Sequence, residues 1–228
     1  MRVLILVAAA SAVGLALLAG SVARAEDAGA DCGTLDMGGT PKFTLGTISP
    51  KAARSYVIRN GSEKAGCPSP SSQCRAKSYL IAGDEVVLGR TSGAFVCTQF
   101  VTAKKNWSAG WLLAADVVPA AAPPSLAAWV GTWEGGGTIT IKPAVKAGAL
   151  SIKGSAAFKD NTGEIEAVAV PDGANLSFTM DGGDKTLPVD QGEGCKVWMG
   201  RGRRNLIVAD NGQCGGVNVS FEGVYTRR

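Results

Sequence analysis

Short apolar runs separated by turn-forming residues make up residues 31–118. A Gly-Asp pair at residues 83–84 and a Ser-Gly pair at residues 92–93 are typical of connections between antiparallel strands. Each run predicts a strand of about four to six residues, and the close spacing of the runs indicates a compact small barrel. The runs lie at residues 56–58, 79–81, 86–88, 95–97 and 110–113.

Apolar and polar residues alternate with a period of two in the second half, residues 127–228, as in strands with one buried face. Turn formers such as Asp172 and Gly173 separate the alternating segments. We expect about eight strands, and an up-and-down antiparallel barrel closes that number without leaving edges. The apolar faces are Ile139 and Ile141, Leu150 and Ile152, Leu176 with Phe178 and Met180, and Val217 with Val219 and Phe221; further strands are expected at residues 164–170, 195–200 and 205–209.

A stiff segment with few large side chains lies between these two patterns. Pro119, Pro123 and Pro124 stand there among alanines, a composition typical of a semi-rigid spacer. The sequence therefore predicts an all-β protein of two domains, a small barrel at residues 31–118 and an up-and-down β-barrel at residues 127–228. We expect the linker at residues 119–126.

The first residues have the three parts of a secretory signal peptide. Arg2 supplies the positive charge, residues 3–19 are apolar, and Ala23-Arg24-Ala25 fits the small-x-small cleavage pattern. We therefore expect residues 1–25 to be removed and the mature protein to be periplasmic or secreted. No later apolar stretch reaches the roughly 18 to 20 residues of a membrane span, so no membrane anchor is expected after cleavage.

Six cysteines follow the expected signal peptide. Because export takes the chain to an oxidising compartment, an even number of cysteines indicates disulfides. Cys67 and Cys74 are close enough to clip a proline-containing loop, which leaves Cys32 to pair with Cys97. The alternative joins Cys74 to Cys97 and Cys32 to Cys67. Cys195 and Cys214 are the only cysteines of the second half, and we expect them to bond to each other across neighbouring strands.

The balance of charges gives no argument for a nucleic-acid partner. The chain has 23 Lys and Arg against 19 Asp and Glu, and loss of Arg2 and Arg24 with the leader lowers the net charge from +4 to +2. Proteins that bind nucleic acids carry a basic face or stripe rather than near neutrality. We therefore expect no nucleic acid among the partners.

The absence of histidine narrows the possible chemistry further. Serine–histidine and cysteine–histidine nucleophiles are excluded, and so are zinc sites built on histidine. Paired carboxylates remain, as in glycosidases. One pair is Glu164 with Glu166, and the other is Glu134 with Glu222. Because no extended cleft pattern surrounds either pair, we expect no enzyme, no cofactor and no metal site.

Three segments of the first half resemble the bacterial Src-homology-3-like (SH3-like) domain: residues 83–89, 93–97 and 110–112. They have the family's order of a Gly-Asp turn, a strand, a Gly-aromatic turn and a late Gly-Trp. Members of that family commonly target cell-wall peptides or glycans. The resemblance therefore implies a non-enzymatic binding module whose partner is a cell-wall peptide or glycan.

Four aromatic side chains of this module are candidates for its ligand face. Phe95, Phe100, Trp107 and Trp111 could present rings suited to sugars or proline-rich peptides, although a core role is the alternative for most of them. Trp107 is the strongest candidate, because it follows the polar residues 104–106 in what we expect to be an exposed loop.

The start of the second half, Gly131-Thr132-Trp133, resembles the Gly-x-Trp opening of lipocalin-like and avidin-like barrels. In those families the tryptophan plugs one barrel end and a late arginine covers it, a role that the resemblance gives to Arg227. The C-terminal residues 206–225 are similar to uncharacterised proteobacterial envelope proteins, some of which resemble periplasmic lysozyme inhibitors. That likeness makes an inhibitor of lysozyme, or of another lytic enzyme, the alternative function.

An inhibitor needs a rigid, protruding loop that enters the cleft of its target enzyme. The loop between Cys67 and Cys74 and the basic tip at residues 201–204 are the two candidates. The tip, Arg-Gly-Arg-Arg, is the densest basic run of the chain and could also receive an anionic polymer, with an ordinary charged hairpin as the other reading.

Overall fold

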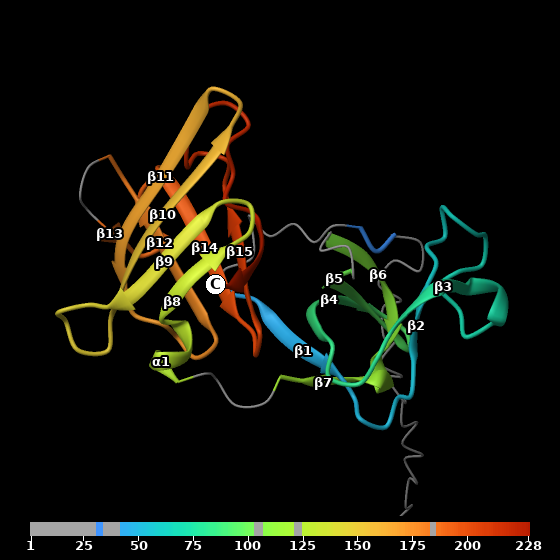
Figure 1. Cartoon of the computed structure of the whole chain (residues 1–228). Coiled ribbons are helices and arrows are strands. Elements are labelled where there is room, and N and C mark those ends of the chain that lie inside the picture. The colour runs from blue at the N-terminus through green and yellow to red at the C-terminus, as the bar shows by residue number, and fades with distance from the viewer. Residues whose placement is uncertain (1–30, 34–41, 103–106, 121–124, 183–185) are drawn as a thin grey trace, which may run out of the picture.

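The computed structural model (Figure 1) describes residues 31–33, 42–102, 107–120, 125–182 and 186–228. The signal peptide expected at residues 1–25 lies outside the described residues, and so do residues 121–124 of the expected linker.

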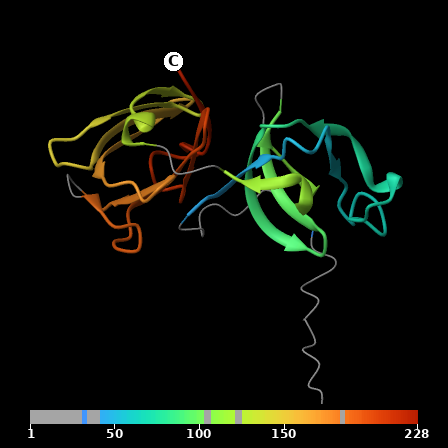
Figure 2. The same cartoon turned by 90° about the horizontal axis from the view of Figure 1, so that it is seen from below.

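Two antiparallel sheets make up the protein, which confirms the predicted all-β class. The first sheet forms a half-barrel and the second a nearly closed barrel, and we use these two names below. They lie side by side in both views (Figures 1 and 2). The α-helix labelled in Figure 1 has four residues, and no helix in the described part of the chain is long and apolar enough to cross a membrane.

The half-barrel has seven strands in the order β3-β2-β6-β5-β4-β1-β7. All five predicted runs are strands, and the structure adds β1 and β7, which the sequence analysis missed. Because β7 pairs with β1, Pro119 ends this sheet rather than beginning a linker. The elements are β1 (Thr44–Ile48), β2 (Ser55–Ile58), η1 (Ser72–Cys74), β3 (Arg75–Leu80), β4 (Glu85–Ser92), β5 (Phe95–Val101), β6 (Trp107–Leu113), η2 (Ala114–Asp116) and β7 (Val117–Pro119), where η marks a 3-10 turn.

The barrel follows the predicted up-and-down path, with one strand hydrogen-bonded to the next around most of its circumference. Strand β16 pairs with β8 and closes one side, whereas β11 and β12 are not paired in a ladder. At this seam the short strand β13 lies beside β12, and the Val168 backbone N–H donates to Thr186 Oγ1 at 3.2 Å. The elements are α1 (Leu126–Trp129), β8 (Gly131–Glu134), β9 (Thr138–Pro143), β10 (Leu150–Phe158), β11 (Asn161–Ala169), β12 (Asn175–Met180), β13 (Thr186–Leu187), β14 (Cys195–Arg201), β15 (Asn205–Asp210) and β16 (Gly223–Arg227).

The predicted alternation fills the barrel interior. Ile139 and Ile141 are fully buried, as expected for one face of β9. Trp133, Phe178 and Tyr225 from other strands are also fully buried and belong to the same apolar cluster. Inward residues therefore occupy the barrel, as in small barrels whose interior is filled by side chains.

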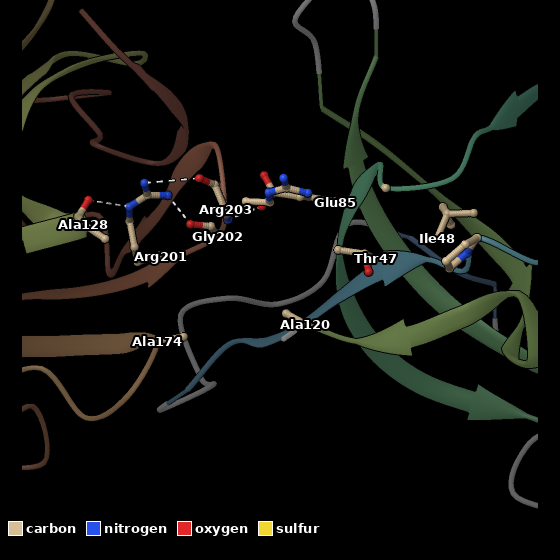
Figure 3. Close-up of a pocket in the computed structure, with 11 residues that line it drawn as sticks. Thr47, Ile48, Glu85, Ala120, Ala128, Ala174, Arg201, Gly202 and Arg203 are labelled. Atoms are coloured by element: carbon tan, nitrogen blue, oxygen red, sulfur yellow. Dashed lines mark hydrogen bonds between the residues drawn. The ribbon is translucent and has the colours of Figure 1, made fainter. Parts of the chain in front are cut away.

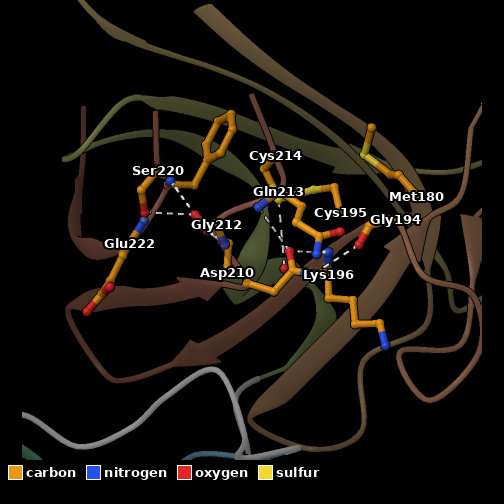
Figure 4. Close-up of a disulfide and its surroundings, with 12 residues drawn as sticks. Met180, Gly194, Cys195, Lys196, Asp210, Gly212, Gln213, Cys214, Ser220 and Glu222 are labelled. Atoms are coloured by element: carbon orange, nitrogen blue, oxygen red, sulfur yellow. Dashed lines mark hydrogen bonds between the residues drawn. A yellow bond between two sulfur atoms is a disulfide. The ribbon is translucent and has the colours of Figure 1, made fainter. Parts of the chain in front are cut away.

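One predicted strand, at Val217 to Phe221, is wrong. These residues form an irregular loop, in which Val217 is 72% exposed, and the last strand begins only at Gly223. The Asp210 carboxylate accepts hydrogen bonds from the Ser220 hydroxyl at 2.9 Å and from the Phe221 backbone N–H at 2.5 Å (Figure 4). The Asp210 side chain thus satisfies one backbone N–H that a strand ladder would otherwise satisfy.

The favoured disulfide pairing is confirmed, and the alternative pairing is wrong. The bonds are Cys32–Cys97, Cys67–Cys74 and Cys195–Cys214. The third one joins the start of β14 to the loop after β15, as Figure 4 shows. Three disulfides are typical of a protein that matures outside the cytosol.

An apolar cluster joins the half-barrel to the barrel, and we call it the junction. Phe43 and Val87 of the first unit meet Trp198 and Ile207 of the second, and all four side chains are buried. Those two barrel residues point outward from β14 and β15, so the half-barrel covers a face that would otherwise be exposed. The junction therefore fixes how the two units lie against each other.

Polar contacts reinforce the junction at one end. Lys42 Nζ lies 2.5 Å from the Asp172 carboxylate, and the Phe43 backbone N–H donates to Asn175 Oδ1 at 2.6 Å. Gly200 permits the close approach of Phe43, because a Cβ at Gly200 would come within 2.7 Å of the Phe43 ring. Sequence patterns within either half contain no sign of this contact.

Candidate functional site

The four aromatic residues predicted as a ligand face do not form one exposed surface. Trp111 is fully buried and Phe95 is 5% exposed, both in a cluster around the Cys32–Cys97 disulfide. Phe100 lies in the core of the half-barrel. Trp107 begins β6 instead of lying in an exposed loop, and its half-buried side chain packs against the junction. The prediction of a shared aromatic face is therefore wrong.

Segments distant in sequence cover these rings. The disulfide of Cys32 brings the N-terminal segment onto β5 next to Trp111, and the Arg90 guanidinium lies 5.2 Å from the Trp111 ring centroid. Trp107 is covered by the neighbouring barrel. The period-two pattern shows which residues share a face, but it does not show what covers that face.

The structure instead places a pair of tyrosines, one half-buried and one exposed, side by side on β2 and β3. Tyr56 and Tyr79 are directly opposite each other in the strand pairing, with ring centroids 5.8 Å apart. Arg54 lies over the Tyr79 ring at 4.5 Å, and Arg75 lies over the Tyr56 ring at 5.5 Å. Tyr79 is 42% exposed. We call these four residues the tyrosine platform.

The platform carries positive charge beside its rings. A side-chain hydrogen bond with Tyr56, followed by the proximity of Tyr79 and Tyr56, raises the pKa of Arg54. Lys77 lies two residues from Arg75 and from Tyr79, so it is on the same face of β3, and it is exposed. Rings and cations thus face solvent together, which suits a ligand that has both flat apolar faces and acidic groups.

A groove of about 620 Å³ begins at Tyr79 and reaches the barrel. One wall is the end of β3 with the turn into β4, and the opposite wall carries Arg204 and Asn205 of the β14–β15 turn. The lining residues are Lys77, Ser78, Tyr79, Leu80, Ile81, Gly83, Asp84, Glu85, Phe100, Val101, Thr102, Arg204 and Asn205. The groove therefore extends the tyrosine platform across the boundary between the two units.

A cavity of about 570 Å³, which Glu85 also lines, lies between the two units (Figure 3). Small or apolar residues form most of its wall. The lining residues are Thr47, Ile48, Pro50, Gly83, Glu85, Ala120, Ala128, Ala174, Arg201, Gly202 and Arg203. Gly83 and Glu85 line both the groove and the cavity, so the two hollows are neighbours.

The Glu85 carboxylate is held by the turn between β14 and β15. It accepts hydrogen bonds from the backbone N–H of Arg203, from the backbone N–H of Arg204 at 3.2 Å, and from Asn205 Nδ2 at 2.9 Å. The basic tip at residues 201–204, which the sequence identified as a possible anion receptor, therefore receives an anion from its own chain. No sequence signal connects Glu85 with a turn more than a hundred residues away.

Arg201 lies beneath this turn and is only 6% exposed. Its Nε donates to the Ala128 carbonyl at 2.9 Å, and its Nη1 donates to the carbonyls of Gly202 and Asn205. Burial lowers the pKa of Arg201, nearby Arg227 lowers it further, and Glu85 opposes the shift. Among the described residues no carboxylate forms an ion pair with Arg201.

Two arginines cover the buried Trp133 at the end of the barrel. The guanidinium carbons of Arg201 and Arg227 lie 4.6 Å and 4.8 Å from the Trp133 ring centroid. The indole N–H donates to the Trp129 carbonyl of α1 at 3.0 Å. The arginine contact expected from Arg227 is thus present, and Arg201 is a second cover that the sequence analysis did not identify.

The carboxylates considered for catalysis lie on the exterior. Glu166 forms an ion pair with Lys153 at 2.6 Å, and Glu134 forms one with Arg228 at 3.4 Å, both exposed to solvent. Within the described ranges no cluster of three or more acidic or cysteine side chains is arranged to hold a metal ion. The features that stand out in the described structure are the tyrosine platform, the groove and the cavity.

Comparisons with protein-family models, with curated proteins and with solved structures find no match to this chain.

Proposed function

We propose that the protein is an exported, non-enzymatic binding protein of the cell envelope, periplasmic or secreted, whose half-barrel recognises a cell-wall glycan or peptide. The observation that carries the proposal is the tyrosine platform, in which the exposed Tyr79 ring and the half-buried Tyr56 ring are flanked by Arg54 and Arg75, with Tyr79 lining the groove. The resemblance of the first half to bacterial SH3-like domains supports the same class of partner.

The chemistry of the platform suits a polymer of sugars or short peptides with acidic groups. An aromatic ring offers a flat apolar face for the C–H groups of a sugar ring or for a peptide side chain. Arginine beside the rings binds carboxylates through paired N–H groups. The groove extends this contact beyond Tyr79, so a ligand longer than one unit would touch both the rings and the basic turn.

Co-sedimentation of the full-length mature protein with purified peptidoglycan tests this proposal. Tyr79→Ala removes the more exposed ring, and at about 1 kcal/mol or more for a stacked ring we expect binding to weaken at least several-fold. Phe158→Ala is the matched control. Phe158 is also 42% exposed and has a cation, Lys159 Nζ, 5.6 Å from its ring, but it lies on β10 of the barrel.

The expected result is loss of binding in the Tyr79 variant and wild-type binding in the Phe158 variant. Failure of the wild-type protein to sediment with peptidoglycan would refute the wall-binding proposal. An equal loss in both variants would show that the platform has no particular role.

Inhibition of a lytic enzyme is the second candidate, and the clipped loop favours it. The Cys67–Cys74 disulfide closes a short loop whose residues 69–73 are mostly exposed. In Figure 1 this loop extends from the half-barrel on the side away from the barrel. Lysozyme activity measured with a large molar excess of the protein separates the two functions, since unchanged activity removes the inhibitor function for that enzyme.

A further inference from the structure

We propose that the β14–β15 turn is a carboxylate-binding site that Glu85 of the same chain occupies, and that a compact carboxylate ligand binds there by displacing Glu85. The hydrogen-bond donors of this site lie on the barrel, and the groove and the cavity border it. It does not depend on the tyrosine platform or on a cell-wall partner.

The turn presents three N–H donors to a single carboxylate. Two are backbone groups, of Arg203 and Arg204, and the third is Asn205 Nδ2. Successive backbone N–H groups in a turn form a concave anion site, and hydrogen bonds to an ionised acceptor are stronger than neutral ones. The seated Glu85 carboxylate shows that the geometry of the turn accepts this group.

The charges around the turn also favour an anion. Arg201 is buried beneath the turn, and its hydrogen bonds go to carbonyl oxygens. Among the described residues, no carboxylate forms an ion pair with its guanidinium. Arg203 and Arg204 are both exposed, and Arg203 lines the cavity whereas Arg204 lines the groove. Glu85 supplies the one carboxylate hydrogen-bonded to this turn in the described structure.

Space for the body of a ligand lies directly beside the carboxylate. The cavity of about 570 Å³ borders Glu85 and is walled largely by small or apolar side chains, with Ile48 and Pro50 on one side and Ala128 and Ala174 on the other. Figure 3 shows Glu85 reaching from the half-barrel toward Arg203, with the cavity residues around this contact. A carboxylate with a compact apolar body fits this combination of charge and wall.

Glu85 acts in this arrangement as an internal competitor. A ligand can bind only to the fraction of molecules in which the turn is vacant, so its apparent affinity is lowered by that fraction. Displacement of Glu85 also removes one of the contacts that join the two units. Ligand binding and loosening of the junction are therefore coupled.

Isothermal titration calorimetry of the full-length mature protein tests the proposal, with N-acetyl-alanyl-alanine as the probe and its C-terminal amide as the uncharged counterpart. Glu85→Ala empties the turn and should bind the acid at least about tenfold more tightly than the wild type does. Glu85→Gln, which keeps the shape and removes the charge, should show a smaller gain. The amide should not bind measurably to any of these proteins.

Asp172→Ala is the matched control. It removes another carboxylate that links the two units, through its contact with Lys42, but it does not empty the turn. It should bind the probe as weakly as the wild type does. In the Glu85→Ala background, Asn205→Leu should reverse most of the gain, since it removes the side-chain donor. Thermal melting of each variant confirms that the fold is retained.

Three results would overturn the proposal. They are equal affinity of Glu85→Ala and the wild type, equal binding of acid and amide, and a gain in Asp172→Ala as large as that in Glu85→Ala. The last result would assign the effect to a looser junction instead of a vacated carboxylate site.

Discussion

Replacement of each disulfide by a pair of alanines should lower the free energy of unfolding in the order of the loop lengths that the bonds close. The bonded residues are separated by 65, 19 and 7 positions for Cys32–Cys97, Cys195–Cys214 and Cys67–Cys74. With these lengths the chain-entropy relation gives losses of about 4.3, 3.2 and 2.4 kcal/mol. The first and last variants should therefore differ by about 2 kcal/mol.

Local packing should preserve this order. All six cysteines are buried, between 1% and 7% exposed, so the loss of two sulfur atoms costs each variant a similar amount. Cys32 additionally holds the N-terminal segment against the buried Trp111. Removing the Cys32–Cys97 bond should uncover that ring and increase the loss beyond the chain-entropy value.

Guanidinium chloride unfolding of the full-length mature protein, followed by tryptophan fluorescence, measures these differences. The wild type and the three paired variants are compared under the same conditions, and a single transition in each is required before free energies are compared. A Cys67–Cys74 variant as destabilised as the Cys32–Cys97 variant would refute the reasoning. It would mean that the clipped loop stabilises the native state by contacts rather than by restricting the unfolded chain.

Two further predictions concern the junction and the barrel interior. Gly200→Val should force Phe43 out of its place and lower the free energy of unfolding by about 1 to 3 kcal/mol in guanidinium chloride. A variant as stable as the wild type would contradict the described contact. Burial raises the pKa of Tyr225, so the folded state favours the neutral phenol. That contribution to stability is complete below about pH 10 and is lost as the pH rises above it. Unfolding measured from pH 8 to 11 should therefore show a smaller alkaline loss in Tyr225→Phe than in the wild type, whereas parallel curves would contradict a buried phenol.

Local features of the sequence were sufficient to predict most strands. Alternation at Ile139 and Ile141 predicts a strand with one buried face, and both side chains are fully buried in β9. The turn before β4 was also predictable, because Gly83 has a φ of 84°, a conformation that glycine adopts without steric cost. These features depend mainly on neighbouring residues, which is why they could be predicted from the sequence.

The same local reasoning failed where a distant or unexpected group took part. The alternation of Val217, Val219 and Phe221 matches a strand. The Asp210 carboxylate accepts a hydrogen bond from the Phe221 backbone N–H, however, and the segment is irregular. Strand β7 was missed because its three residues pair only with β1, which the sequence pattern also did not identify.

The sequence by itself determined the all-β class and favoured the pairing of Cys67 with Cys74, because the first follows from the alternation of apolar residues and the second from short-range spacing. Only the tertiary structure decided which aromatic rings face solvent. Trp107 and Trp111 are covered by segments far away in the chain, whereas Tyr79 stays exposed on β3, an edge strand of its sheet. The contact of Glu85 with the β14–β15 turn was likewise decided by the tertiary structure. Burial and charge pairing between two units depend on both surfaces, whereas a sequence pattern describes one element at a time.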